Sequence, residues 1–588
     1  MSANNEDARA PTILKLTIER FRGIQRLEWW PTSGLNVILG GGDVGKSTIL
    51  DAIALLFSPT NTSVISDADF WARKPEDEFC IEAIISIAPG TGINQQTKNA
   101  WPWHWDGKEA QLPDLEAEGA TIPVYRVRVR GTSEFDLAYE VVQPDGNANH
   151  FSTAVRRAIG LVRLGGDDRN DRDLRMVQGS ALDRLLSDRT LRSRLTDALA
   201  DTDVQSHLKG DAKKKLDDLD ASFKQKALPS DLKLGFTGSQ GFTIGALLGL
   251  TASKVETQLP LSNWGAGTRR LAALEIAAAQ QGELPIVLID EMERGLEPYR
   301  QRMLVADIEG RRSQTFLTTH SAAVLGALSR AQIWYLDAFG KIGALKSSVV
   351  APHQMRDPEL FLSRLTIVAE GKTEVGFVRH LLEKNISPAP LNFGLLVADA
   401  VGHESALSLL EALAAGGMAF GAFVDNENLH PTRWKSVADK IGPLFFQWSE
   451  TSTEATIIKL VTAEQLQQLI EDPTGDLTGE RLRTLADRIG IAEKSFDAIS
   501  KAAPNLHDLI IQAATGSIPD SERDADKPRK KALQKHGQCW FKTDDGGREL
   551  AAKMATLGIL PQLESQLLPF INALRAVLGQ SALGSLVA

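Results

Sequence analysis

The chain has 588 residues, of which 43% are hydrophobic and 24% charged, with 48 glycines and 25 prolines. This ordinary globular composition excludes collagen-like, disordered and coiled-coil-dominated proteins, and the length predicts roughly two to four domains. The formal net charge of −10 excludes a generally polybasic protein, so contact with nucleic acid would need a local basic groove or bound metal ions. Two distant cysteines, Cys80 and Cys539, exclude a zinc cluster and a disulfide scaffold.

The sequence shows no pattern typical of secretion or membrane insertion. The first residues lack the basic and apolar regions of a signal peptide, and no apolar run approaches the roughly 20 residues that cross a bilayer. We therefore expect a cytoplasmic protein with no membrane partner.

The N-terminal part predicts strands, a helix and then an antiparallel sheet. Residues 13–21 and 35–42 have the pattern of strands, the second buried and ending in glycines. Alternating stretches between residues 78 and 142 predict an antiparallel layer. The helix expected after Lys46 has an apolar face made of Ile49, Leu50, Ile53, Ala54 and Phe57.

A charged region, residues 169–235, interrupts this pattern with leucines set among Arg and Asp. Within it, residues 211–226 predict a solvated helix that Pro229 ends. We interpret the region as a helical insertion and dimerisation arm, which would make the protein a homodimer or a higher homo-oligomer. A helical lid without a partner would explain the same pattern.

Short strands and helices alternate again from residue 284 to 358, and a fresh alternation starts at residues 364–371. This organisation predicts an α/β protein: an ATPase domain divided between residues 1–168 and 236–358, and a second, parallel α/β domain with a helical extension over 359–588. The polar stretch 505–535 predicts a loop or a weak helix.

Residues 40–47, GGGDVGKS, match the pattern of a phosphate-binding loop between a strand and a helix. In such loops the glycines let backbone N–H groups surround the phosphates, the lysine reaches the β and γ oxygens, and the serine holds Mg²⁺. A glycine-rich turn with an incidental lysine is the plainer alternative. The residues expected to bind ATP here are Gly40, Gly45, Lys46, Ser47 and Thr48.

A second element supports this interpretation. The apolar run at residues 284–289 predicts a buried strand that ends in Asp290 and Glu291. Asp290 would bind Mg²⁺, mostly through water, and Glu291 would polarise the attacking water. A strand ending in Asp-Glu is a weak signal alone, but together with the loop it predicts ATP hydrolysis.

Acidic residues also follow two strands of the second domain. Glu370 ends the strand 366–369, and Glu374 comes four residues later, so a helical turn would point both the same way. Asp425 and Glu427 follow the strand 420–424 and alternate to one side. Such carboxylates repel one another without cations, and oxygen ligands favour Mg²⁺ or Mn²⁺. Singly, Glu370 could interact with a helix dipole and Asp425 could be a turn residue; jointly they predict a two-ion site.

Four segments of the first domain resemble ABC-type ATPases of the RecF and SMC kind: ERFRGI (19–24), the loop with Lys46, DEMERGLEP (290–298) and FLTTHS (316–321). The resemblance implies that His320 senses the γ-phosphate. It also implies that Gly265 and Gly267, at the position of the signature loop, reach a partner's nucleotide, although the match there is only Gly-x-Gly.

The second domain resembles a TOPRIM domain, the metal-dependent module of topoisomerases, primases and certain nucleases. The motif order along nearly the whole chain resembles the OLD (overcoming lysogenisation defect) family, Gabija-like defence nucleases included, although Glu427 replaces the usual second Asp. This implies further metal ligands, Ser452 and Glu454, and a lysine near the scissile phosphate, Lys542, for which an ordinary exposed lysine is an equal explanation. His403 is expected to be structural rather than a ligand.

These patterns predict an ATP-regulated, metal-dependent DNA endonuclease with two Mg²⁺ or Mn²⁺ ions in the second domain, one Mg²⁺ with ATP, and Glu370 assisting proton transfer. The basic tract 527–531 would add contacts to DNA. The resemblance implies antiphage defence, sometimes beside a UvrD-like helicase. Two alternatives remain: a topoisomerase, which would need a partner's tyrosine because all four tyrosines lie in the ATPase half, and an ATP-switched DNA clamp with an inactive second site.

Overall fold

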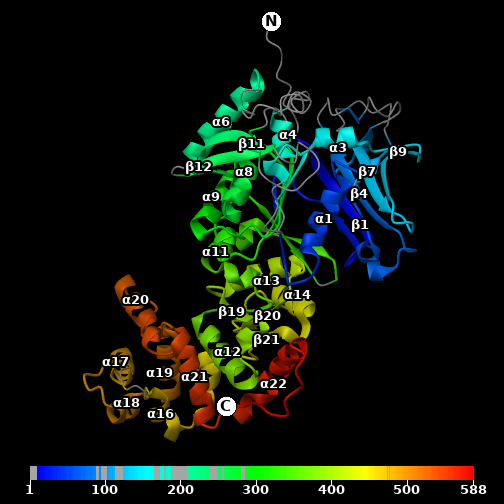
Figure 1. Cartoon of the computed structure of the whole chain (residues 1–588). Helices are drawn as coiled ribbons and strands as arrows, with labels where there is room; N and C mark the ends of the chain where they lie inside the picture. The colour runs from blue at the N-terminus through cyan, green and yellow to red at the C-terminus, as the bar shows by residue number, and fades with distance from the viewer. Residues whose placement is uncertain are drawn as a thin grey trace. The chain divides into compact units, whose positions relative to one another are not determined.

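The computed structural model divides into two compact units, residues 1–347 and 348–588 (Figure 1). It describes residues 10–61, 63–87, 92, 93, 102–112, 123–164, 172–177, 180–186, 205, 208–236, 248–254, 257–279, 285–337, 339–472, 475 and 477–587. Among these residues, no helix combines the length and the apolar character that crossing a bilayer requires.

The first unit contains an antiparallel sheet with strand order β2-β1-β4-β7-β5-β6, in which β8 pairs with β7 and β9 with β8. This confirms the antiparallel layer expected between residues 78 and 142, and adds the hairpin partner β2 that the sequence analysis did not anticipate. The strands are β1 (Thr12–Phe21), β2 (Ile24–Trp29), β4 (Phe79–Ser86), β5 (Trp103–Trp105), β6 (Ala110–Gln111), β7 (Pro123–Gly131), β8 (Leu137–Val142) and β9 (Ala148–His150).

A second sheet of the first unit has the order β10-β14-β15-β3-β16-β17 and is parallel except for β17. Helix α1 (Lys46–Leu56) contacts strands of both sheets, and its apolar side chains join one core with them. The two sheets and α1 therefore form three layers. The strands are β3 (Leu35–Gly40), β10 (Leu161–Leu164), β14 (Ile286–Ile289), β15 (Thr315–Thr318), β16 (Gln332–Leu336) and β17 (Ile342–Leu345).

The region expected to be a helical insertion is only partly described. Helix α6 (Asp211–Gln225) confirms the expected helix, and it buries Leu216, Leu219 and Phe223 rather than being solvated all round. Strand β11 (Ser230–Phe236) begins inside the expected insertion and pairs with β12 (Leu248–Lys254), which pairs with β13 (Thr257–Pro260). Residues 187–204 lie outside the described part. The other helices of this unit are α3 (Thr153–Ile159), α4 (Ala181–Leu186), α8 (Ala266–Ala278), α9 (Pro298–Glu309) and α10 (Ala322–Leu325).

The second unit is built on a parallel sheet of order β19-β18-β20-β21, which confirms the expected parallel α/β arrangement. Because such crossovers are right-handed, α12 (Lys372–Asn385) covers one face, and α13 (His403–Gly416) and α14 (Pro431–Ile441) cover the other. The chain reverses direction across the sheet after β19, and open sheets of this kind bind ligands beyond the carboxyl ends of their strands. The strands are β18 (Leu365–Ala369), β19 (Leu395–Asp399), β20 (Phe420–Val424) and β21 (Phe445–Gln447).

The C-terminal helices share one hydrophobic core with α12 and the sheet. The expectation of a loop or weak helix at 505–535 was wrong, because α19 (Leu506–Thr515) buries an apolar face and α20 (Lys527–Lys535) carries the basic tract. The remaining helices are α11 (Ser347–Arg356), α15 (Thr453–Leu460), α16 (Leu466–Ile470), α17 (Thr478–Ile489), α18 (Phe496–Ala502), α21 (Asp544–Thr556) and α22 (Leu560–Val577).

Candidate functional site

The loop between β3 and α1 opens a cavity of about 370 Å³. Gly45 caps α1 with a φ of 103°, a left-handed conformation that glycine adopts without strain. The ammonium group of Lys46 donates to the carbonyl oxygens of Gly40 (3.0 Å) and Gly41 (2.6 Å), and burial lowers its pKa. The predicted residues that line the cavity are Gly45, Lys46, Ser47, Thr48, Asp290, Glu291 and His320.

Asp290 ends β14 beside this loop, as the sequence predicts for a residue that binds the nucleotide's Mg²⁺. Its Oδ1 accepts hydrogen bonds from the hydroxyls of Ser47 (3.1 Å) and Thr318 (2.6 Å). Thr318, from β15, also accepts from the backbone N–H of Glu291 (2.9 Å). Thr318 was not among the residues predicted from the sequence; a threonine at the end of a neighbouring parallel strand was the available signal.

Glu291 has a left-handed backbone (φ 47°), an uncommon conformation for glutamate that neighbouring groups must hold. The guanidinium of Arg270, on α8, donates to the carbonyl oxygens of Asp290 (2.8 Å) and Glu291 (2.5 Å). Since the side chain of Glu291 is 48% exposed, it can reach a water molecule in the cavity. This arrangement suits the predicted role of Glu291 in water activation.

His320 follows β15 and is exposed at the cavity, where its backbone N–H donates to Glu293 (2.7 Å). Gly265 and Gly267 do not line this cavity; they lie at the start of α8. A Cβ atom on Gly267 would lie 2.3 Å from the carbonyl oxygen of Gly295, so glycine is required there for packing. A Cβ atom on Gly265 would have open space around it.

In the second unit, five carboxylates meet at the carboxyl edge of the sheet. Glu370 follows β18, Glu374 lies in the first turn of α12, and Asp425 follows β20. Ligand atoms lie within 4.8 Å of one another in each of two groups, and the backbone N–H of Asp425 donates to Glu370 (3.3 Å) between the groups. The first group is Glu370, His403 and Glu427, and the second is Glu374, Asp425 and Glu454.

Four of these carboxylates are buried: Glu370, Glu374, Asp425 and Glu454. Burial, followed by repulsion from Glu454, raises the pKa of Glu374 to about 8. Burial and the charges of Glu374 and Glu454 hold the pKa of Asp425 well above its usual range, and burial also raises that of Glu370. Ionising any of these three carboxyl groups therefore costs free energy unless a cation is present.

Threonines that were not predicted from the sequence orient this cluster. Thr453 donates to Oδ1 of Asp425 from its backbone N–H (2.9 Å) and its hydroxyl (3.0 Å). The hydroxyl of Thr373 lies 2.9 Å from both Glu454 and the carbonyl oxygen of Phe541. The hydroxyl of Ser452, a predicted ligand, accepts from the backbone N–H of Ala455 (3.3 Å) and caps α15.

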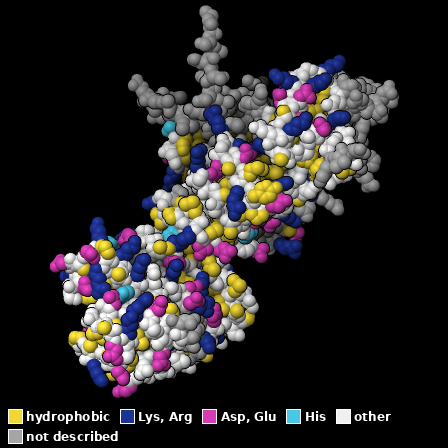
Figure 2. Space-filling view, turned by 90° about the vertical axis from the view of Figure 1, so that its left-hand side faces the viewer, with side chains coloured by type: hydrophobic (Ala, Val, Ile, Leu, Met, Phe, Trp, Pro, Cys, Tyr) yellow, Lys and Arg dark blue, Asp and Glu magenta, His cyan; other side chains and the backbone are white. Residues whose placement is uncertain are grey.

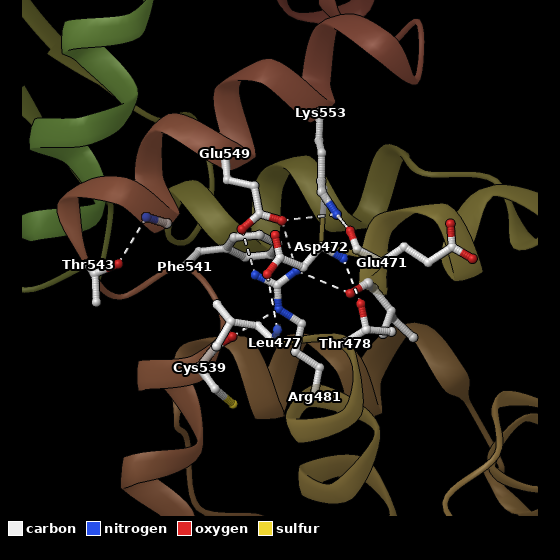
Figure 3. Close-up of polar contacts among 12 residues, drawn as sticks. Glu471, Asp472, Leu477, Thr478, Arg481, Cys539, Phe541, Thr543, Glu549 and Lys553 are labelled. Atoms are coloured by element: carbon white, nitrogen blue, oxygen red, sulfur yellow. Dashed lines mark hydrogen bonds and ion pairs between the residues drawn. The ribbon is translucent and has the colours of Figure 1, made fainter. Parts of the chain in front are cut away.

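The segment that carries Lys542 is held against α12 from the C-terminal side. The fully buried guanidinium of Arg481 donates to the carbonyl of Cys539 (2.9 Å) and forms a paired contact with Glu549 (2.8 and 2.6 Å), as Figure 3 shows. A Cβ atom on Gly547 would lie 2.1 Å from the carbonyl oxygen of Thr373, so α21 and α12 touch backbone to backbone. The side chain of Lys542 is exposed and lies over Gly537. Lys542 directly follows Phe541, whose carbonyl oxygen contacts the hydroxyl of Thr373.

The chemistry of the donors fits divalent cations. All five carboxylates offer oxygen, and among the described residues no lysine or arginine forms an ion pair with any of them. His403 is the only basic side chain within ion-pair distance of the cluster in that part of the chain. Oxygen-rich, negatively charged sites of this kind suit Mg²⁺ or Mn²⁺. Glu427 is half exposed, whereas Glu374, Asp425 and Glu454 form the buried side.

Residues 138–326 match the family described as "AAA domain, putative AbiEii toxin, Type IV TA system". The match covers Asp290, Glu291 and His320 but begins after the phosphate-binding loop. No curated protein matches the chain.

Solved structures similar to the chain include ATPase heads. The Smc head bound to the C-winged helix domain of ScpA is 15% identical, with a TM-score of 0.37 over 57% of this chain and 97% of that one. The Smc head domain with an extended coiled coil from Pyrococcus furiosus, bound to the C-terminal domain of ScpA, is 14% identical (TM-score 0.36; 59% and 100%). The recombination mediator protein RecF bound to ATP is 15% identical (TM-score 0.34; 58% and 100%).

The family match and the loop–strand geometry around Lys46 and Asp290 lead to the same conclusion: the first unit contains an ATP-binding ATPase domain.

Proposed function

We propose that the chain is an ATP-regulated, divalent-metal-dependent DNA endonuclease, with nucleotide turnover in the first unit and phosphodiester hydrolysis in the second. The observation that carries the proposal is the meeting of five carboxylates that no lysine or arginine neutralises in the described part of the chain. A structural cluster of this charge would lower stability without a function in return.

Two bound cations would supply water activation and charge neutralisation at a phosphodiester. Glu374, Asp425 and Glu454 would hold one ion from the buried side, and Glu370 and Glu427 would hold the other nearer the surface. Glu370 is our candidate for accepting a proton from the attacking water. Lys542, which is exposed, would contact the phosphate.

Contact with DNA requires local basic groups. Lysines and arginines are interspersed with acidic side chains on the face seen in Figure 2, so no uniformly basic surface covers it. Helix α20 presents exposed lysines 527, 531 and 535 at a four-residue spacing, which places them on one helical face. This face would contribute salt-dependent phosphate contacts.

ATP binding at Lys46 and turnover by Glu291 would regulate cleavage. Because the motif order resembles that of the OLD family, we extend the proposal to antiphage defence. The chain would act as a homodimer or higher oligomer and beside a UvrD-like helicase.

Supercoiled plasmid incubated with Mg²⁺ or Mn²⁺ tests the proposal. We expect nicked or linear DNA from the wild type, none from Glu370→Ala, and an altered rate from Lys46→Ala and Glu291→Gln. Glu383→Gln, a change to an exposed glutamate of the same helix as Glu374, is the matched control and should cut normally. Cleavage that ignores ATP, ADP and the Lys46 change would exclude regulation by nucleotide.

The same assay separates the alternative functions. Relaxed closed circles would indicate a topoisomerase, although the second unit contains no tyrosine to act as its nucleophile. Unchanged plasmid that the protein nevertheless binds would indicate an ATP-switched clamp.

A further inference from the structure

His403, which the sequence predicts to be structural, lies between the carboxylate cluster and Trp434. It is the first residue of α13, and its Nδ1 is 3.5 Å from Oε2 of Glu370 and 3.9 Å from Oε2 of Glu427. Its Nε2 is 3.1 Å from the indole nitrogen of Trp434, and the two rings meet edge to face with centroids 5.2 Å apart. One side of the imidazole ring therefore faces the cluster and the other faces the indole.

The partner on Nε2 determines where the ring proton resides. An indole N–H can only donate a hydrogen bond, so Nε2 of His403 must supply a lone pair to Trp434. The proton of the neutral ring then lies on Nδ1, which is buried, has no hydrogen-bond partner among the described residues, and lies 3.5 Å from Glu370 and 3.9 Å from Glu427. A protonated Nδ1 has no lone pair for a cation and can act only as a hydrogen-bond donor.

The surrounding contacts keep the two rings in this relation. Trp434 is 3% exposed and packs against Phe445, with ring centroids 6.0 Å apart. Arg433, the preceding residue, joins α14 to α13 by donating to Glu404 (2.7 Å) and to both oxygens of Glu411 (2.9 Å each).

The residue before His403 forms a hydrogen bond to the backbone of Glu370. The N–H of Gly402 donates to the carbonyl oxygen of Glu370 (2.7 Å), and Gly402 has a φ of 103° that favours glycine. The imidazole therefore reaches Glu370 from a segment that is already hydrogen-bonded to the backbone of that residue.

We propose that His403 is a positioning residue of the metal site, whose Nδ1–H, directed by Trp434, orients Glu370 and Glu427 for divalent ions without itself binding them. The inference rests on the proposed metal-binding function of the cluster. It assigns a role to Trp434 as well, because removing the indole N–H frees Nε2 and releases the constraint on the ring proton. Groups that orient metal ligands in this way affect metal affinity strongly.

A matched pair of substitutions tests the role of the Nδ1 donor. The amide of asparagine lies near the position of Nδ1 in histidine, and that of glutamine lies near Nε2. We expect His403→Gln to weaken Mn²⁺ binding by the full-length protein about 10-fold, measured by titration of free Mn²⁺ with electron paramagnetic resonance, and His403→Asn to restore most of the affinity. Equal affinity in the wild type and His403→Gln would overturn the proposal.

The tautomer itself is measurable without metal or DNA. With ¹⁵N-labelled histidine in the full-length, metal-free chain, the His403 signals, assigned by their loss in His403→Asn, should report a protonated Nδ1 and an unprotonated Nε2. Trp434→Phe should shift this balance toward Nε2–H. A proton on Nε2 in the wild type, or an imidazole nitrogen coupled to bound Mn²⁺ that disappears in His403→Gln, would refute the proposal.

These readouts separate this inference from the proposed function. If the wild type binds Mn²⁺ and shows the expected tautomer but cuts no DNA, only the nuclease proposal fails. If the wild type cuts DNA and His403→Gln binds Mn²⁺ and cuts as well as the wild type, only the role of His403 fails.

Discussion

The two candidate sites both lie at the carboxyl ends of parallel strands, but they differ in how their charged groups are compensated. In the first unit, Asp290 accepts hydrogen bonds from two hydroxyls, and Lys46 lies in the same cavity and donates to backbone carbonyls. In the second unit, Glu374, Asp425 and Glu454 are buried together, and none has a lysine or arginine partner among the described residues.

The comparison shows which site depends on its ion. In the nucleotide pocket, polar groups such as the ammonium group of Lys46 already form hydrogen bonds within the protein. When ATP binds, these groups exchange protein partners for phosphate oxygens. In the carboxylate cluster, repulsion is opposed by one histidine and a few threonine and backbone donors, so a cation removes a free-energy penalty that the fold otherwise carries. Metal removal should therefore affect the second unit far more than nucleotide removal affects the first.

The largest expected effect comes from removing one charge of the cluster without changing its shape. Asp425→Asn keeps an oxygen for Thr453 to donate to but loses a metal ligand, so nicking should fall by at least about 100-fold. ATP hydrolysis should remain near the wild-type rate, and the melting temperature in chelator should rise because repulsion falls. Nicking at the wild-type rate would show that the cluster is not the nuclease centre.

A smaller effect concerns pH in the absence of metal. The pKa of Glu374 is raised to about 8 in the folded protein, so between its unfolded value and pH 8 the folded state binds the extra proton. The free energy of unfolding should therefore decrease as pH rises through this window, by at most about 5 kcal/mol in total. Thermal melting in chelator at pH 5.5 and 8.5 measures this loss.

Two controls identify the source of that pH dependence. Mg²⁺ should restore the stability lost at pH 8.5, because metal binding requires the ionised carboxylates. Glu374→Gln should reduce the dependence, since the amide does not titrate, and the raised pKa values of Asp425 and Glu370 should account for what remains. A stability that rises with pH in chelator would contradict the assigned repulsion.

The smallest effect concerns a hydroxyl that supports the cluster. Thr373→Val removes the group that lies between Glu454 and Phe541 and should cost about 1 kcal/mol of stability and weaken Mn²⁺ binding several-fold. Thr366→Val is the matched control, because its buried hydroxyl donates to Leu360 away from the cluster (2.7 Å). We expect the two variants to lose similar stability, but only Thr373→Val to bind Mn²⁺ more weakly than the wild type. Equal affinities would show that Thr373 has no part in orienting Glu454.

Periodicity predicted most of the central elements and failed at particular places. The strands β3, β14, β18 and β20 were recognisable because buried parallel strands are continuous apolar runs that end at glycine or acid. Helix α19 was missed because the polarity of the surrounding stretch 505–535 masked its four buried positions.

By itself, the sequence determined what lies within a few residues along the chain: the glycine loop before Lys46, the acids after β14, and the acids after β18 and β20. These are local because a strand end and a helix start fix the direction of neighbouring side chains. Only the tertiary structure decided that Thr373 contacts Glu454, that Phe541 contacts Thr373 from the C-terminal segment, and that Trp434 faces His403. Those contacts join residues from about 30 to 170 positions apart, and their geometry depends on how helices pack on the sheet rather than on any local pattern.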